Sequence, residues 1–102
     1  MTSRDIRTAA LRAMVELSVD GYVLVRWADG EEALVRYDTF LPSDETADGS
    51  EECVVDVIRT GARAPSNRGL IAGTAATITS NDPPSEVATP DGARRWMFAA
   101  PV

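Results

Sequence analysis

The sequence predicts an α+β fold in which one N-terminal amphipathic helix packs on an antiparallel sheet of four to five strands, in the order α-β-β-β-β-β. The N-terminal residues have apolar side chains at helical spacing, later stretches alternate apolar and polar residues, and turn residues separate them. A strongly curved, barrel-like sheet is a variant of this prediction. A chain of 102 residues is long enough for its own core, so we expect a single small domain over residues 1–102.

The N-terminal helix is expected to begin at a capping box and to end before a glycine. Thr2 is placed as the N-cap residue, with Asp5 reaching back to its amide. Asp20 and Gly21 supply the stop, with Gly21 in the left-handed position after the helix. Spacings of three and four residues place one apolar set on the same helix face: Ile6, Ala9, Ala10, Ala13, Met14 and Leu17.

Residues 22–40 are expected to form a β-hairpin whose turn decides its register. A two-residue loop would face Arg26 with Ala33 and mix charge into both faces. A three-residue loop, with Gly30 in the left-handed bulge position, pairs Arg26 with Glu32 instead. We prefer this second register because a one-residue slip exchanges the two faces of a strand. This register turns one group of side chains toward the helix: Val23, Val25, Trp27, Ala33, Val35 and Tyr37. The other face receives Tyr22, Leu24, Arg26, Glu32, Leu34 and Arg36.

Three further strands are expected, over residues 52–60, 70–80 and 93–100. The first alternates apolar and polar side chains. The second is rich in Ile and Thr, and the third carries Trp96 on its apolar face. The connections between these elements are turn-rich and lack a hydrophobic period: residues 41–51, 60–69 and 81–92.

The charge of the chain is concentrated in one segment. Sixteen acids against ten bases, all arginine, give a formal net charge of −6, and residues 38–52 carry six of the acids and no base. A general nucleic-acid binder is expected to be basic, so direct contact with nucleic acid is not expected. No apolar run approaches the roughly 20 residues of a membrane span, and no signal-peptide pattern opens the chain. We therefore expect a cytoplasmic protein that does not enter a membrane.

Catalysis is not expected either. Without His or Lys, the usual bases that activate a Ser, Thr or Cys nucleophile are missing, and metal or haem ligation is disfavoured. The single cysteine, Cys53, is interpreted as a small hydrophobe in an apolar strand rather than as a nucleophile. Carboxylate catalysis and divalent-ion binding rank below solvation, because the acidic run lacks apolar residues to desolvate it. We expect no cofactor and no metal.

The first function class that fits is a small acidic protein-binding module. It would act as an inhibitor or adaptor that blocks a basic surface of a larger partner, including a nucleic-acid-binding surface whose phosphates it imitates. In size and composition the chain resembles phage or mobile-element proteins that block host defence, such as anti-CRISPR proteins, and its arginine-only usage fits a GC-rich bacterial or phage genome. Exposed sheet edges would also permit a homodimer. The partner contact is predicted to involve seven residues: Asp38, Phe40, Asp44, Glu45, Asp48, Glu51 and Glu52.

The second function class is a module that recognises a peptide or a modified side chain. Residues 25–35 read VRWADGEEALV, and together with the Leu-Pro pair at 41–42 they resemble the closing hairpin of Tudor-like and other SH3-like barrels. In that family, aromatic residues near this hairpin build a cage for methylated side chains through cation–π contacts. The resemblance implies such a role for Trp27, Tyr37 and Phe40. The competing interpretation packs these aromatics in the core beneath the helix.

Overall fold

The computed structural model describes residues 3–61 and 68–97, with the backbone alone for residues 3–7. Its elements are, in chain order, α1 (Ser3–Leu17), β1 (Tyr22–Arg26), β2 (Glu32–Leu41), the 3₁₀ helix η1 (Ser43–Glu45), β3 (Glu52–Thr60), β4 (Ala75–Thr79), β5 (Glu86–Ala88) and β6 (Arg95–Met97). The strands form one antiparallel sheet in the order β4-β3-β2-β1-β5-β6. One N-terminal helix packed on an antiparallel sheet confirms the predicted fold class.

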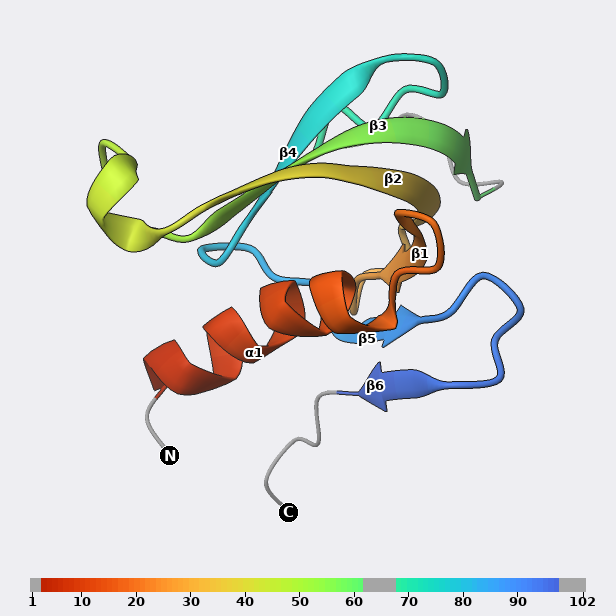
Figure 1. Cartoon of the computed structure of the whole chain (residues 1–102), viewed down its shortest axis with the longest axis horizontal. Helices are drawn as coiled ribbons and strands as arrows, with labels where there is room; N and C mark the ends of the chain where they lie inside the picture. The colour runs from red at the N-terminus through yellow and green to blue at the C-terminus, as the bar shows by residue number, and fades with distance from the viewer. Residues whose placement is uncertain (1–2, 62–67, 98–102) are drawn as a thin grey trace.

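The strand count was predicted too low, because β5 falls in the 81–92 segment that the sequence presents as a connection. This strand has only three residues and follows two prolines, so it shows no measurable alternation. It pairs with β1 on one side and with β6 on the other. The sheet is open within the described residues, with β4 and β6 as its edges, and Figure 1 shows it arching over α1.

The core lies between α1 and the concave face of the sheet. Ala10, Ala13, Met14 and Leu17 are buried as predicted, and Leu11 is also completely buried although it lies outside the predicted face. The arched sheet covers the helix on more than one side, so its buried face is wider than a flat sheet would require. The predicted capping box and the side chain of Ile6 lie outside the described residues.

The helix ends earlier than the sequence indicates. It stops at Leu17, and both Asp20 and Gly21 have positive φ angles, 53° and 88°. Val19 and Tyr22 exchange two backbone hydrogen bonds of 2.9 Å across this pair. Asp20 and Gly21 therefore form a tight two-residue turn that leads into β1, and Gly21 is a turn residue rather than a helix cap.

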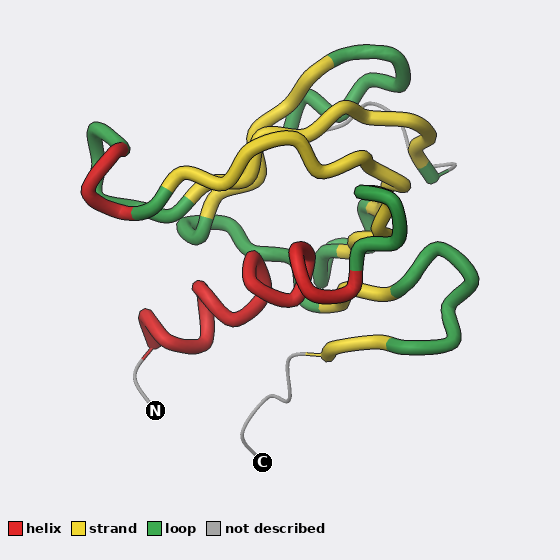
Figure 2. The backbone as a smooth tube through the Cα atoms, viewed as in Figure 1, coloured by secondary structure: helices red, strands yellow, loops and turns green. Residues whose placement is uncertain are grey.

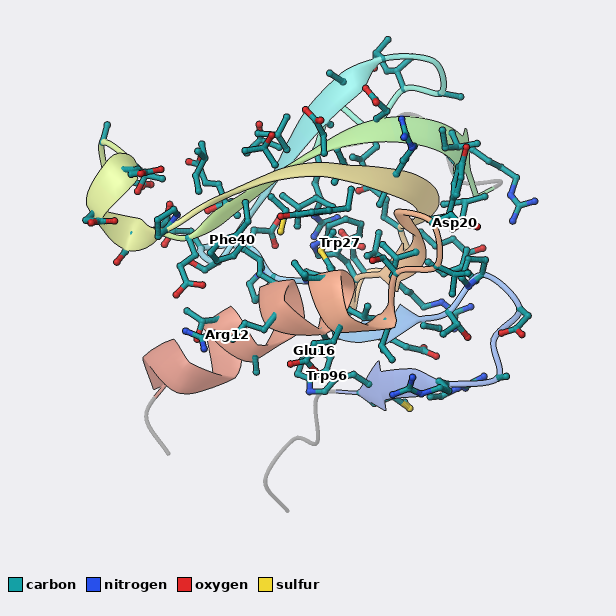
Figure 3. All side chains as sticks on the ribbon, in the orientation of Figure 1. Arg12, Glu16, Asp20, Trp27, Phe40 and Trp96 are labelled. Atoms are coloured by element: carbon teal, nitrogen blue, oxygen red, sulfur yellow. The ribbon has the colours of Figure 1, made fainter. Side chains whose placement is uncertain are left out.

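The predicted hairpin register is confirmed. Arg26 pairs with Glu32, and Gly30 has a φ of 94° in a turn where the amide of Trp27 donates to the carbonyl oxygen of Glu31 at 2.8 Å. The apolar set that this register turns toward the helix is buried, and Tyr37 packs against it while remaining half-buried. Figure 3 shows Trp27 between the helix and the sheet.

Cys53 on β3 is completely buried, and its thiol donates a long hydrogen bond of 3.9 Å to the carbonyl oxygen of Leu11. Burial, and secondarily the charge of Glu51, raises the pKa of the Cys53 thiol to about 12 from an ordinary value of 9.0. Such a thiol is neutral near physiological pH and is a poor nucleophile.

We expect native Cys53 to resist a thiol reagent at about pH 8 and to react once the chain is unfolded in urea. Because its folded pKa lies above the unfolded value, the thiol contributes stability that is present below pH 9.0 and is lost as the pH rises toward 12. The Cys53→Ala variant should show a shallower loss of unfolding free energy over this interval. Equal slopes for the two proteins, or rapid labelling of the native chain, would contradict this prediction.

Candidate functional site

The seven predicted contact residues gather at one end of the β2–β3 hairpin. Residues 42–51, which we call the acidic loop, connect these strands and project from the body of the molecule (Figure 2). Asp38 and Phe40 lie on the last part of β2, and Glu52 is the first residue of β3. The remaining members lie in the acidic loop itself: Asp44, Glu45, Asp48 and Glu51.

Four of these carboxylates face solvent. Asp44 and Glu45 are exposed on η1, and Asp48 is exposed in the turn that follows. Asp38 is also exposed, because a register shift between Tyr37 and Thr39 leaves it outside the β2–β3 pairing. Within residues 8–61 and 68–97, whose side chains the structure describes, no arginine forms an ion pair with any of the four.

Hydrogen bonds hold the acidic loop in one conformation. The Thr46 hydroxyl donates to the carbonyl oxygen of Ser50 at 2.6 Å. The Asp48 carboxylate accepts from the Ser50 amide at 3.0 Å, from the Ser50 hydroxyl at 2.6 Å and from the Asn81 side-chain amide at 2.8 Å. The bonds from Ser50 hold the pKa of Asp48 below its ordinary value. Asp48 therefore stays ionised and fixed in position.

The other three predicted contact residues are not displayed in this way. Glu51 is only 9% exposed, with its Oε1 3.7 Å from Arg12 and its Oε2 buried without a hydrogen-bond partner. Phe40 packs against the core, and Glu52 is half-buried. Glu51 is drawn inward because its amide and carbonyl both bond to Ser80, which ties the loop exit to the end of β4. The sequence shows a uniform acidic run and carries no local signal for this difference.

The hairpin aromatics lie in or against the core. Trp27 is 2% exposed, and its indole N–H donates to the carbonyl oxygen of Asp82 at 2.9 Å. The guanidinium of Arg68 lies over the Trp27 ring, 4.6 Å from its centroid. Tyr37 and Phe40 are half-buried against the same cluster. A cage for an external cation would need the face of the Trp27 ring that Arg68 covers. The hypothesis of a Tudor-like recognition module therefore stays a prediction without support from this geometry.

Arg68 is a residue whose importance the sequence does not reveal. Its Nη1 lies 2.9 Å from an oxygen of Asp29 and 2.6 Å from one of Glu31, and its Nε lies 2.6 Å from one of Asp82. Burial lowers the pKa of Arg68, but its bonds to the three carboxylates outweigh this and raise the pKa above its ordinary value. In the sequence Arg68 belongs to a local group of arginines, whereas in the structure it is bound by three carboxylates.

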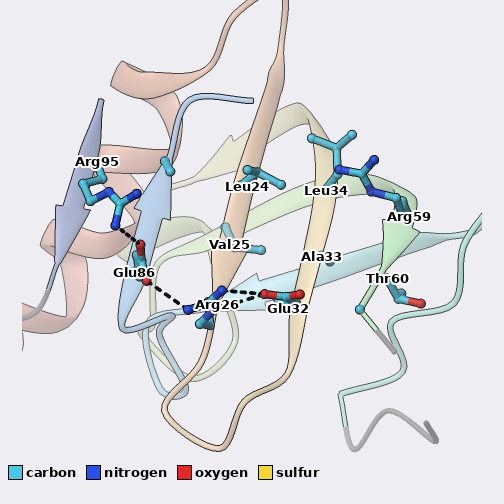
Figure 4. Close-up of a pocket in the computed structure, with 12 residues that line it drawn as sticks. Leu24, Val25, Arg26, Glu32, Ala33, Leu34, Arg59, Thr60, Glu86 and Arg95 are labelled. Atoms are coloured by element: carbon cyan, nitrogen blue, oxygen red, sulfur yellow. Dashed lines mark hydrogen bonds and ion pairs between the residues drawn. The ribbon is translucent and has the colours of Figure 1, made fainter. Parts of the chain in front are cut away.

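A second site lies on the face of the sheet opposite α1. A groove of about 300 Å³ crosses several strands there (Figure 4). Leu24 on β1 and Leu34 on β2 are register partners, and both are half-buried beneath it. The hairpin register already places these two leucines on the polar side of the sheet, and this is the signal by which the sequence could have indicated the groove.

Ion pairs run along the rim of this groove from strand to strand. Arg26 lies 2.9 Å from Glu32 and 3.7 Å from Glu86, and Arg95 lies 3.3 Å from Glu86. Each distance joins a guanidinium nitrogen to a carboxylate oxygen, and Figure 4 marks the three contacts. Both carboxylates at the groove are thereby paired. Arg59 also lines the groove and forms no ion pair with the side chains described for residues 8–61 and 68–97.

Comparisons with protein-family models, with curated proteins and with solved structures give no significant match. In the part of the chain that the structure describes, no helix is both long and apolar enough to span a membrane. The same residues contain no group of three or more Cys, Asp or Glu side chains arranged to hold a metal ion. The functional argument therefore depends on the two surfaces described above.

Proposed function

We propose that this protein is a small acidic protein-binding module, an inhibitor or adaptor that docks its acidic loop on a basic surface of a larger partner. One observation carries the proposal. Asp38, Asp44, Glu45 and Asp48 are exposed at the projecting end of the β2–β3 hairpin, and no arginine of the described residues is ion-paired with them.

Charge and rigidity both favour such an interface. Uncompensated carboxylates attract a basic partner over a distance of about one Debye length, and the attraction accelerates association. The hydrogen bonds of Thr46 and Asp48 fix the loop before binding, so less conformational entropy is lost on association. A small number of charges can therefore give useful binding affinity, because little of their interaction energy is spent on ordering the loop.

The basic surfaces that proteins present most often bind phosphates, so a nucleic-acid-binding site is the partner surface that suits this loop best. Carboxylates on a projecting loop would present negative charge to a surface that otherwise binds phosphate groups. This activity is non-enzymatic and corresponds to counter-defence of the anti-CRISPR type, which the size and composition of the chain resemble.

The test compares two variants with the same change in charge. The loop variant carries Asp44→Asn and Glu45→Gln in the acidic loop together with Asp38→Asn at the adjoining end of β2, and leaves Asp48 to hold the loop. The control variant carries three substitutions at exposed acids outside the loop: Glu16→Gln, Asp20→Asn and Asp56→Asn.

Wild-type protein is first used to capture a partner from bacterial lysate at low salt, and the affinity of the purified partner for each variant is then measured. We expect the loop variant to bind at least tenfold more weakly and the control variant to bind within a factor of about two. The wild-type complex should weaken as salt rises, and DNA should compete for the partner. Equal loss of affinity in both variants would show that net charge alone, rather than the loop, causes binding.

A further inference from the structure

The face of the sheet opposite α1 has no covering element within residues 3–61 and 68–97, and strand register orders its side chains into rows. One row runs through Arg95, Ala88, Leu24, Leu34 and Arg59, which lie on β6, β5, β1, β2 and β3 respectively. Neighbouring strands are about 4.8 Å apart, so the path that follows the sheet across four strand spacings, from Arg95 to Arg59, is about 19 Å long. The row is therefore an apolar floor with an arginine at each end.

The groove above this floor differs in charge from the rest of the protein. Three arginines and two glutamates line it, which gives a net charge of +1 on a chain of net charge −6. Because Glu32 and Glu86 are already paired with Arg26 and Arg95, Arg59 remains, among the side chains that the structure describes, a guanidinium without an ion pair beside the apolar floor. An occupant of this groove gains most from a carboxylate at the Arg59 end.

We propose that the groove docks an extended segment of a protein partner in which two apolar side chains lie between two acidic residues. The apolar side chains would cover Leu24 and Leu34, and the carboxylates would reach Arg59 and Arg95. Along an extended chain alternate side chains face the same side, and the six steps from the first to the last of seven residues span about 20 Å. The matching pattern is therefore acid-x-apolar-x-apolar-x-acid.

This inference goes beyond the proposed function because it concerns a different surface and the opposite charge. The acidic loop projects from the far end of the β2–β3 hairpin, whereas the groove lies across the middle strands of the sheet. A protein that holds a basic partner with one surface and an acidic segment with the other joins two molecules. The groove thus favours an adaptor over a simple inhibitor.

The test uses a blocked heptapeptide of sequence Glu-Ser-Leu-Ser-Leu-Ser-Glu, titrated into ¹⁵N-labelled full-length protein. We expect saturable shifts of the backbone amides of Leu24, Leu34 and Ala88, with the acidic-loop amides unchanged. A peptide with Lys at both ends should bind at least fivefold more weakly. Equal binding of the two peptides, an absence of shifts, or shifts confined to the acidic loop would overturn the proposal.

Two variants make the test specific. Arg59→Gln removes the uncompensated guanidinium without breaking an ion pair of the described residues, and it should weaken the acidic peptide at least fivefold. Arg36→Gln makes the same change on β2, at an exposed position outside the groove lining, and should leave binding unchanged. Similar effects of the two substitutions would overturn the proposal. Concentration-dependent dimerisation that Leu34→Glu abolishes would instead assign this face to a second copy of the chain.

Discussion

Replacing Arg68 with methionine is expected to lower the free energy of unfolding by about 3 kcal/mol, because removal of one partner of a buried ion pair takes away an opposite charge that stabilises the other partner in its buried position. Methionine keeps much of the aliphatic volume but removes the guanidinium from Asp29, Glu31 and Asp82. The side chain of Glu31 is only 8% exposed, so it bears most of this cost. The two aspartates are 40% and 53% exposed and are solvated instead, which places the expected loss at the low end for buried pairs.

A double-mutant cycle separates this cause from lost packing. Glu31→Gln in the Arg68→Met background should recover part of the lost stability, because it removes the buried negative charge whose ion pair with Arg68 is already lost. Arg26→Met is the matched control: Arg26 is 56% exposed, and its surface ion pairs should contribute less than about 1 kcal/mol. Urea denaturation followed by circular dichroism measures the four proteins of the cycle, which are the wild type, Arg68→Met, Glu31→Gln and the double variant, and also the Arg26→Met control. Additive effects of the two substitutions would contradict the assigned role of Arg68.

Truncating Trp27 to alanine should cost about 4 kcal/mol, a large part of the 5–15 kcal/mol that stabilises a typical domain. Trp27 is 2% exposed and belongs to the core. Its loss opens a cavity, and it also removes the hydrogen bond to Asp82 and the ring beneath Arg68. A variant that unfolds at the wild-type urea midpoint would show that the indole is not part of the stabilising core.

The Trp27→Phe variant should have an unfolding free energy between those of the wild type and Trp27→Ala. It keeps an aromatic face for Arg68 but removes the indole N–H that bonds to the carbonyl oxygen of Asp82 at 2.9 Å. We expect a smaller loss of about 1–2 kcal/mol, from the carbonyl group that loses its partner and from the reduced volume. The remaining tryptophan, Trp96, reports unfolding by fluorescence in both variants.

The predictions for Arg68 and Trp27 also bear on the candidate site. The turn that follows β4 contacts both the acidic loop and Arg68, since Asn81 bonds to Asp48 of the loop and Asp82 bonds to Arg68. Damage to the Arg68 cluster therefore reaches the acidic loop through adjacent residues. Loop variants avoid this difficulty, because Asp38, Asp44 and Glu45 are exposed and form no ion pair in the part of the chain that the structure describes.

Features that depend on neighbours in the chain could be predicted from the sequence. The hairpin register follows from a three-residue loop with Gly30 at positive φ, and alternation then assigns Trp27 to the core. The location of the acidic loop follows in the same way from its turn residues and its lack of a hydrophobic period. These inferences succeed because turn geometry and side-chain alternation act over a few residues.

Features that depend on strand order required the tertiary structure. β5 has too few residues to show a period, yet its insertion between β1 and β6 brings Ala88 and Glu86 beside the hairpin and completes the groove. The ion pairs of Arg68 join residues 14 to 39 positions apart. The sequence by itself therefore determined the helix, the hairpin register and the acidic segment, through local periodicity and turn chemistry. Only the tertiary structure decided which charges are paired and which remain available to a partner, because pairing depends on contacts between distant segments.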